Sequence, residues 1–134
     1  MKWYLLLFVL LSFSCKSRIT VTEEDIGADM LYEKESYKPY SGICIVTYNH
    51  TDLVKEQFTF KKGVLHGESL SWYKNGNLRR KGYYHKGQIS GKWTFFDEDG
   101  NQTIEANYKQ DILHGSYISL YSNGRIKEKG QFDG

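Results

Sequence analysis

The sequence predicts an all-β protein: an antiparallel meander of tandem β-hairpins that forms an elongated, curved sheet. Three observations lead to this prediction. Several columns of residues recur every 24 positions, Asn-Gly or Asp-Gly turns divide the copies into strand-length runs, and aromatic residues make up 16% of a chain with one proline. Aromatic residues favour strands, and Asn-Gly and Asp-Gly are strong signals for hairpin turns. The 134 residues fit one domain.

Five columns of residues share the 24-residue spacing. They are glycine at 67, 91 and 115; glycine at 76, 100 and 124; an aromatic ring at 60, 84, 108 and 132; glycine or alanine at 82, 106 and 130; and leucine or isoleucine at 65, 89 and 113. An earlier, less regular copy begins at Tyr40, and its turn from Asn49 to Leu53 is one residue longer and lacks glycine. Because a two-stranded unit cannot bury a face alone, we expect the copies to be stabilised by stacking on their neighbours.

The second strand of each copy has one side that we expect to be buried. That side carries Leu78, Gly82 and Tyr84, then Ile104, Ala106 and Tyr108, then Ile126, Gly130 and Phe132. The burial side of the first strand depends on the loop. A three-residue loop, Lys74-Asn75-Gly76, places Trp72, Phe96 and Leu120 on the buried side, whereas a two-residue loop places Tyr73, Tyr121, Trp93 and Phe95 there. One residue of slip exchanges the faces, so both alternatives stay open.

Residues 1–14 are predicted to be a lipoprotein signal peptide. Met1-Lys2 gives a short positive start, and residues 3–13 are apolar apart from Ser12. This run is too short to span ~30 Å of hydrocarbon, which needs about 20 residues. Its end, Ser12 to Cys15, resembles a bacterial lipobox, with Phe13 where a small residue is usual. We expect Cys15 to be the lipid attachment site; an ordinary signal peptide with an incidental cysteine is the alternative.

The compartment and the tether follow from this leader. Residues 15–29 have few large apolar side chains and are predicted to be a polar, lipidated tether. We therefore expect an exported protein anchored in the cell envelope, on the periplasmic face or at the outer membrane. The lipid would be its sole contact with the membrane, since the net charge of +2 does not favour an acidic membrane surface or nucleic acid as a partner.

The repeat from Gly67 to Gly87 resembles the MORN repeat variant. The resemblance rests on the spacing of glycine, Trp72-Tyr73, Asn75-Gly76 and Tyr84, and on the His-Gly steps at residues 66–67 and 114–115. The lead-in from Leu31 to Gly42 is similar to the start of the YwqK-type antitoxin family. The resemblance covers about residues 30–134 and implies a curved hairpin array with scaffold or interaction roles. Ser90 replaces the histidine of one step, and Asp111 replaces a turn glycine.

No metal site, cofactor or catalytic group is predicted. His66 and His114 stand two copies apart, so they should lie on the order of 20 Å from each other, too far to share a metal ion. The acidic run 97–101 lacks the glycine and glutamate spacing of a calcium loop and is explained by the hairpin turn. Cys44, between two isoleucines, is expected to be a small buried hydrophobe. Scattered serines with histidines at turns favour a non-enzymatic protein.

The function predicted from the sequence is a protein-binding or scaffold module of unknown partner and oligomeric state. An antitoxin or immunity protein and a structural envelope spacer are the alternatives. The candidate contact residues share the solvated side of second strands: Arg79, Lys81, Tyr83, Lys127 and Lys129. Arginine and tyrosine are frequent anchors in interfaces, and clustered cations suit an acidic partner surface. Glu105 lies between the two groups in sequence and interrupts them.

Overall fold

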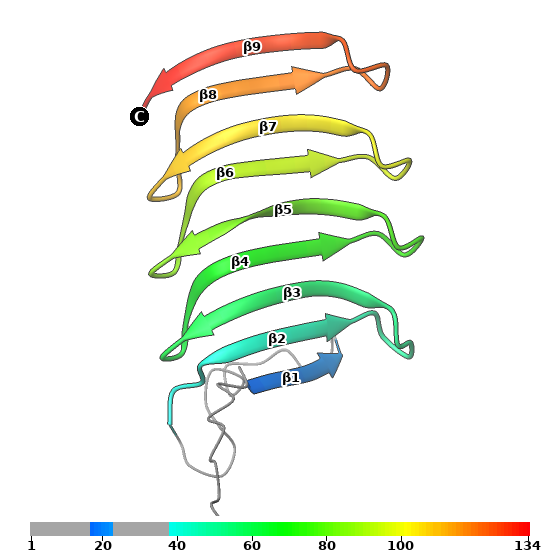
Figure 1. Ribbon diagram of the computed structural model, residues 1–134, viewed down its shortest axis with the longest axis vertical. Coiled ribbons are helices and arrows are strands. Elements are labelled where there is room, and N and C mark those ends of the chain that lie inside the picture. The colour runs from blue at the N-terminus through cyan, green and yellow to red at the C-terminus, as the bar shows by residue number, and fades with distance from the viewer. Residues whose placement is uncertain (1–16, 23–37) are drawn as a thin grey trace, which may run out of the picture.

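The computed structural model describes residues 17–22 and 38–134, which form one open sheet of nine strands in sequence order (Figure 1). The strands are β1 Ser17–Thr22, β2 Gly42–Thr47, β3 Val54–Lys61, β4 Val64–Trp72, β5 Leu78–His85, β6 Gln88–Phe96, β7 Gln102–Lys109, β8 Ile112–Leu120 and β9 Ile126–Asp133. Each strand contacts mainly the strands beside it, so the described residues form a single curved layer. The predicted array of tandem hairpins is confirmed.

Two kinds of tight turn alternate along the array. At one end of the strands, the turns at 62–63, 86–87 and 110–111 have positive φ at both residues, as a type I′ hairpin turn requires. Asp111 accepts this conformation with φ 68°, and its carboxylate accepts a hydrogen bond of 2.7 Å from the Ile89 amide. The glycine absent from this turn is thus replaced by a residue that tolerates positive φ.

At the other end, the three later copies share one loop. The Tyr73 amide donates to the Asn77 carbonyl at 2.9 Å, and the Gly76 amide donates to the Tyr73 carbonyl at 3.0 Å. Gly76, Gly100 and Gly124 have φ of 88°, 88° and 78°. The loop is therefore the three-residue loop that ends in a bulged glycine.

The side that the first strand buries nevertheless differs from the expectation for that loop. The pairing of β4 with β5 shifts between Ser71 and Trp72, where Trp72 pairs with Leu78 and Ser71 with Arg80. Arg79 is the extra residue of this bulge, and it restores the register that a two-residue loop would have given. Trp93 is therefore buried, whereas Trp72 lines an open groove with Ile45. Of the two alternatives that the sequence left open, the structure has the loop of the first and, for Trp93, the burial of the second; Trp72 does not share the buried side.

The packed face is the side of the sheet that carries Trp93. A row of side chains crosses it from strand to strand, and large and small residues alternate along much of the row: Cys44, Phe58, Ser69, Gly82, Trp93, Ala106, Tyr117 and Gly130. Ala106 is fully buried and Trp93 is 2% exposed. Edge-to-face ring contacts join Tyr84 to Trp93 and Tyr117 to Phe132. Because large and small side chains alternate from strand to strand, each ring fills the space beside a small residue, and a single layer can bury its core residues in this way.

A second row on the packed face contains a charged pair. Glu56 and Arg80 lie on either side of Ser71, and the Arg80 Nη2 atom is 3.0 Å from the Glu56 carboxylate. The Arg80 guanidinium also lies 5.9 Å from the centre of the Trp93 ring. These contacts explain how an arginine is accommodated in a row between Ser71 and Phe95.

Two further predictions about this sheet need correction. The tether predicted for residues 15–29 is wrong for Ser17–Thr22, which form β1 and pair in parallel with β2. Four consecutive β-branched residues, 19–22, give this segment strand character. Residues 15–16 and 23–29 of the predicted tether lie outside the described residues, as do Cys15 and the signal peptide.

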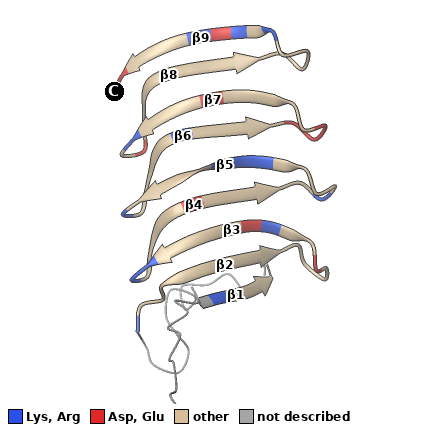
Figure 2. Cartoon of the chain, in the orientation of Figure 1, with Lys and Arg blue, Asp and Glu red and all other residues tan. Residues whose placement is uncertain are grey.

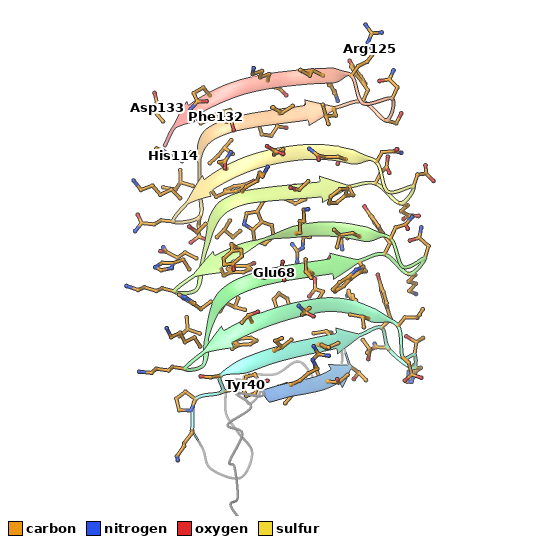
Figure 3. The ribbon with its side chains drawn as sticks, viewed as in Figure 1. Tyr40, Glu68, His114, Arg125, Phe132 and Asp133 are labelled. Carbon is orange, nitrogen blue, oxygen red and sulfur yellow. The ribbon has the colours of Figure 1, made fainter. Side chains whose placement is uncertain are left out.

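The other correction concerns the last strand. Ile126 and Phe132 were expected to be buried, but they are 59% and 41% exposed. Phe132 lies on β9, at the edge of the described sheet (Figure 3). Among the described strands, none follows β9 to cover them.

Residues 17–22 and 38–134 include no helix of the length and apolar character that a membrane crossing requires.

Candidate functional site

The predicted contact residues lie on the solvated face, which we define as the side of the sheet opposite Trp93. Exposure alternates along β5, so that Arg79, Lys81 and Tyr83 are exposed while Gly82 is buried. Tyr83 is 56% exposed. Lys127 and Lys129 are exposed on β9, four strands away. At a strand spacing of ~4.8 Å the two groups are roughly 19 Å apart.

One row of the sheet joins the two groups of cations. Cross-strand pairs run from Lys81 through Thr94, Glu105 and Ile118 to Lys129. Figure 2 shows the basic segment of β5 and the alternation of lysine and glutamate on β9. The structure therefore brings Lys81 and Lys129 onto one line across the face, without bringing them into contact.

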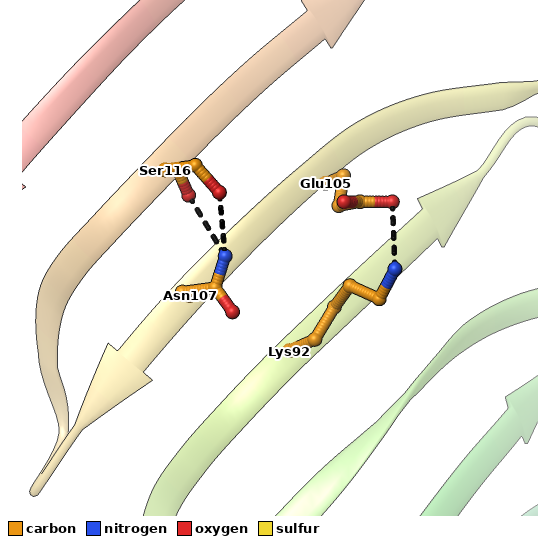
Figure 4. Close-up of polar contacts among 4 residues, drawn as sticks. All are labelled: Lys92, Glu105, Asn107 and Ser116. Atoms are coloured by element: carbon orange, nitrogen blue, oxygen red, sulfur yellow. Dashed lines mark hydrogen bonds and ion pairs between the residues drawn. The ribbon is translucent and has the colours of Figure 1, made fainter.

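Glu105 interrupts this line less than the sequence suggested. The Lys92 Nζ atom lies 3.2 Å from the Glu105 carboxylate, so the negative charge is paired on the same face (Figure 4). The pair is partly exposed, and pairs of this kind contribute at most about 1 kcal/mol. Beside it, the Asn107 amide donates to the Ser116 hydroxyl at 2.8 Å. Lys92 adds a cation that the sequence interpretation missed, because its pairing with Glu105 depends on the register of β6 and β7.

Aromatic rings hold the cations of β5 in place. The Arg79 guanidinium lies 5.9 Å from the centre of the Tyr73 ring, and Lys81 Nζ lies 5.9 Å from the centre of the Phe96 ring. The Tyr73 hydroxyl donates to the Phe96 carbonyl at 2.8 Å, which ties one copy to the next. A cation over a ring keeps its charge, so these contacts orient the side chains without neutralising them.

The acidic run at 97–101 is a hairpin turn in the structure. Asp97 accepts hydrogen bonds from the backbone amides of Asn101, at 2.8 Å, and Asp99, at 3.1 Å. These bonds lower the pKa of Asp97 below its ordinary value of 3.8, and the bond from the Asn101 amide has the largest effect.

Among the residues that the structure describes, no three histidine, cysteine or carboxylate side chains are grouped in a way that could hold a metal ion.

The histidines include one neighbouring pair that the repeat pattern did not reveal. The rings of His66, near the start of β4, and His85, at the end of β5, lie 5.0 Å apart, and His66 Nδ1 accepts a long hydrogen bond of 3.4 Å from the Lys86 amide. His66 and His114, the pair considered from the sequence, lie on β4 and β8, with three strands between them. Their separation agrees with the expectation that they share no ion.

Groups with nucleophilic chemistry lie on the packed face. Cys44 is 1% exposed, and its burial raises the pKa of the thiol to about 11. Ser69 and Ser71 are 1% exposed, and their hydroxyls have no hydrogen-bond partner. A serine nucleophile needs a base within hydrogen-bond reach, and these two hydroxyls contact none.

The 24-residue unit consists of two strands joined by a loop with a bulged glycine. Two copies match the MORN repeat variant. The matched segments are residues 65–86, which span β4 and β5, and residues 89–110, which span β6 and β7. Each matched segment is thus one hairpin with its three-residue loop. No curated protein matches the chain.

Proposed function

We propose that this chain is a non-enzymatic protein-binding module and that its partner presents acidic groups to the solvated face. The observation that carries the proposal is that the two faces of the single layer differ in their contacts. The packed face is occupied by contacts that hold the MORN repeat variants together. The solvated face keeps Arg79 and Lys81 charged, oriented on rings and accessible.

The chemistry of the solvated face suits such a partner. Arg79 and Tyr83 are of the residue types that most often anchor interfaces, and both are exposed on one strand. Lys127 and Lys129 offer a second cationic group roughly 19 Å away. A partner with two acidic patches at that separation would be attracted and oriented by both groups. Such attraction raises the association rate and weakens with added salt.

The cellular setting belongs to the same proposal. A lipid on Cys15 would hold the module at the cell envelope, so that the solvated face meets partners at the membrane surface. An antitoxin is one instance of this function, with a toxin as the dedicated partner. The resemblance of residues 31–42 to antitoxin sequences supports that instance, and the same contact residues would serve it.

Affinity capture with matched variants tests the proposal. The bait pair is wild type and the double variant Arg79→Glu, Lys127→Glu. The control is Lys86→Glu, Lys109→Glu, which reverses two exposed charges near the opposite end of the strands. A specific partner should be retained by the wild type and the control and lost by the double variant. Its affinity for the wild type, measured by calorimetry, should fall as salt is added.

Two results would reject the assignment of the contact surface. If the captured partner binds the double variant as tightly as the wild type, the solvated face is not the contact surface. Binding that is lost equally in the double variant and in the control would show a response to net charge alone and would also reject the assignment.

A further inference from the structure

The solvated face contains an apolar groove at the junction of the first two hairpins. The groove has a volume of about 370 Å³ and is lined by Ile45, Leu53, Val54, Trp72, Tyr73 and Lys74, with Gln57 and Gly76. Ile45 and Gln57 pair across β2 and β3 in the row that continues to Lys81. The volume falls within the range of small-ligand pockets, ~300–1,000 Å³.

The first copy departs from the repeat at Leu53, one of the residues that line the groove. The Tyr48 amide donates to the Leu53 carbonyl at 2.9 Å, the bond that the later copies make to Asn77, Asn101 and Arg125. Leu53 is thus the one apolar residue in an otherwise polar column. It is 51% exposed, and its neighbour Val54 is 36% exposed.

The next junction shows what the polar residue does in that position. The Asn75 and Asn77 side-chain amides both donate to the Glu98 carbonyl at 2.7 Å, which ties the second turn to the third. Leucine has no donor and cannot make the corresponding bond. An exposed leucine at this place therefore contributes nothing to the repeat contact that asparagine makes, and it presents apolar surface instead.

Cations surround the apolar lining. Lys74 Nζ lies 5.4 Å from the centre of the Tyr48 ring, and Arg79 lies over Tyr73, itself a lining residue. In the part of the chain that the structure describes, the acidic residues nearest to this lining in sequence are Asp52, in the first turn, and Glu56, which is paired with Arg80 on the packed face. Apolar walls with a positive rim are complementary to an apolar side chain flanked by carboxylates.

We infer that this groove binds a large apolar side chain from an acidic peptide segment, with a flanking carboxylate against Lys74. The inference rests on the proposed function and deepens it, because the groove lies on the solvated face beside Arg79 and Lys81. A partner strand or loop with acidic residues on both sides of one leucine or phenylalanine would fill the groove and meet the cations. The groove is the anchor, and the cations further along the face orient the rest of the partner.

Synthetic peptides test the inference without the natural partner. The probe is a short peptide with a central phenylalanine between aspartate and glutamate residues, and a second peptide replaces the phenylalanine with alanine. The full chain is titrated with each peptide, and the indole NMR signal of Trp72, assigned with Trp72→Phe, reports binding. The first peptide should shift the signal saturably, and the second should bind roughly tenfold more weakly, the effect of losing one buried ring.

Two variants locate the binding. Leu53→Asn restores the residue found at positions 77 and 101, so the fold should be kept while affinity for the first peptide falls several-fold. Lys74→Glu should weaken binding in a way that added salt reduces, and Lys109→Glu, on a distant exposed lysine, should leave it unchanged. Unfolding in urea checks that each variant is folded.

The outcomes separate this inference from the proposed function. If Trp72 does not respond to the first peptide, or if Leu53→Asn binds it as the wild type does, the groove assignment is wrong whatever the partner does. The other outcome is that the peptide binds in the groove while the captured partner binds the Arg79→Glu, Lys127→Glu variant as tightly as the wild type. The groove assignment is then supported, and the proposed contact surface is rejected.

Discussion

The Trp93 indole ring lies directly on the backbone of Gly82, so closely that a Cβ atom at position 82 would stand within the ring. Trp93 is 2% exposed, and its Nε1 donates to the Tyr83 carbonyl at 3.2 Å. In the following copy the same two places are held by Ala106 and Tyr117, which pair across β7 and β8. Ring size and the size of the facing residue are therefore matched from copy to copy.

Gly82→Ala should destabilise the fold by about 1–3 kcal/mol, because the methyl group displaces the Trp93 ring from a filled site. Urea unfolding measures the loss. The double variant Gly82→Ala, Trp93→Tyr reproduces the Ala106–Tyr117 pair and should recover part of the lost stability. A fully stable Gly82→Ala protein would contradict the packing described for this face.

Gly124→Val should destabilise the fold by about 1 kcal/mol or more, since φ at this position is 78° and a β-branched residue is strained there. A Cβ atom at Gly124 meets no other atom within 4 Å, so the effect isolates backbone strain from packing. Gly124→Asn is the control, because asparagine tolerates positive φ, and it should cost less. Equal losses in thermal unfolding for the two variants would refute strain as the cause.

Cys44 should be unreactive in the folded protein. In a Cys15→Ser background it is the one remaining thiol, and a thiol reagent near neutral pH should label it only after denaturation. Burial raises its pKa from 9.0 to about 11, so the unfolded chain loses this proton first as the pH rises. Titration of the Cys44 thiol therefore lowers the free energy of unfolding as the pH rises from 9.0 to about 11, and it has no effect below that window.

The control for this pH effect is Cys44→Ala, in which the same tyrosines and lysines titrate. The decline in stability over the alkaline window should be smaller in Cys44→Ala than in the parent protein. Rapid labelling of the folded parent near neutral pH would show that the thiol is accessible and that the assignment of Cys44 to the core is wrong.

Cys15→Ala should release the protein from the membrane fraction, because the predicted lipid attachment is lost. Cys15 lies outside the described residues, so this prediction depends on the leader sequence alone. Cell fractionation with detection of the mature protein measures it, and Cys44→Ala, which leaves the leader intact, is the control. Unchanged membrane association of processed Cys15→Ala protein would reject lipidation.

The sequence by itself determined the repeat, its length and the chemistry of its turns. Glycines 76, 100 and 124 require positive φ wherever Asn-Gly or Asp-Gly joins two strands, so the hairpins could be placed before any contact was known. The small residues at 82 and 106 also marked the packed side correctly, because side chains alternate with period two along each strand. Exposure of Arg79, Lys81 and Tyr83 followed from the same alternation.

Tertiary structure decided which side the first strand of each hairpin buries, and with it the groove. The bulge at Arg79 depends on how β4 and β5 pair, a property of two strands together that no single run of residues encodes. The pairing of Lys92 with Glu105 and the exposure of Leu53 beside Trp72 depend on register and on neighbouring copies in the same way. Periodicity in the sequence determines which side of its own strand a residue occupies, whereas contacts between strands depend on how the strands pair in the assembled sheet.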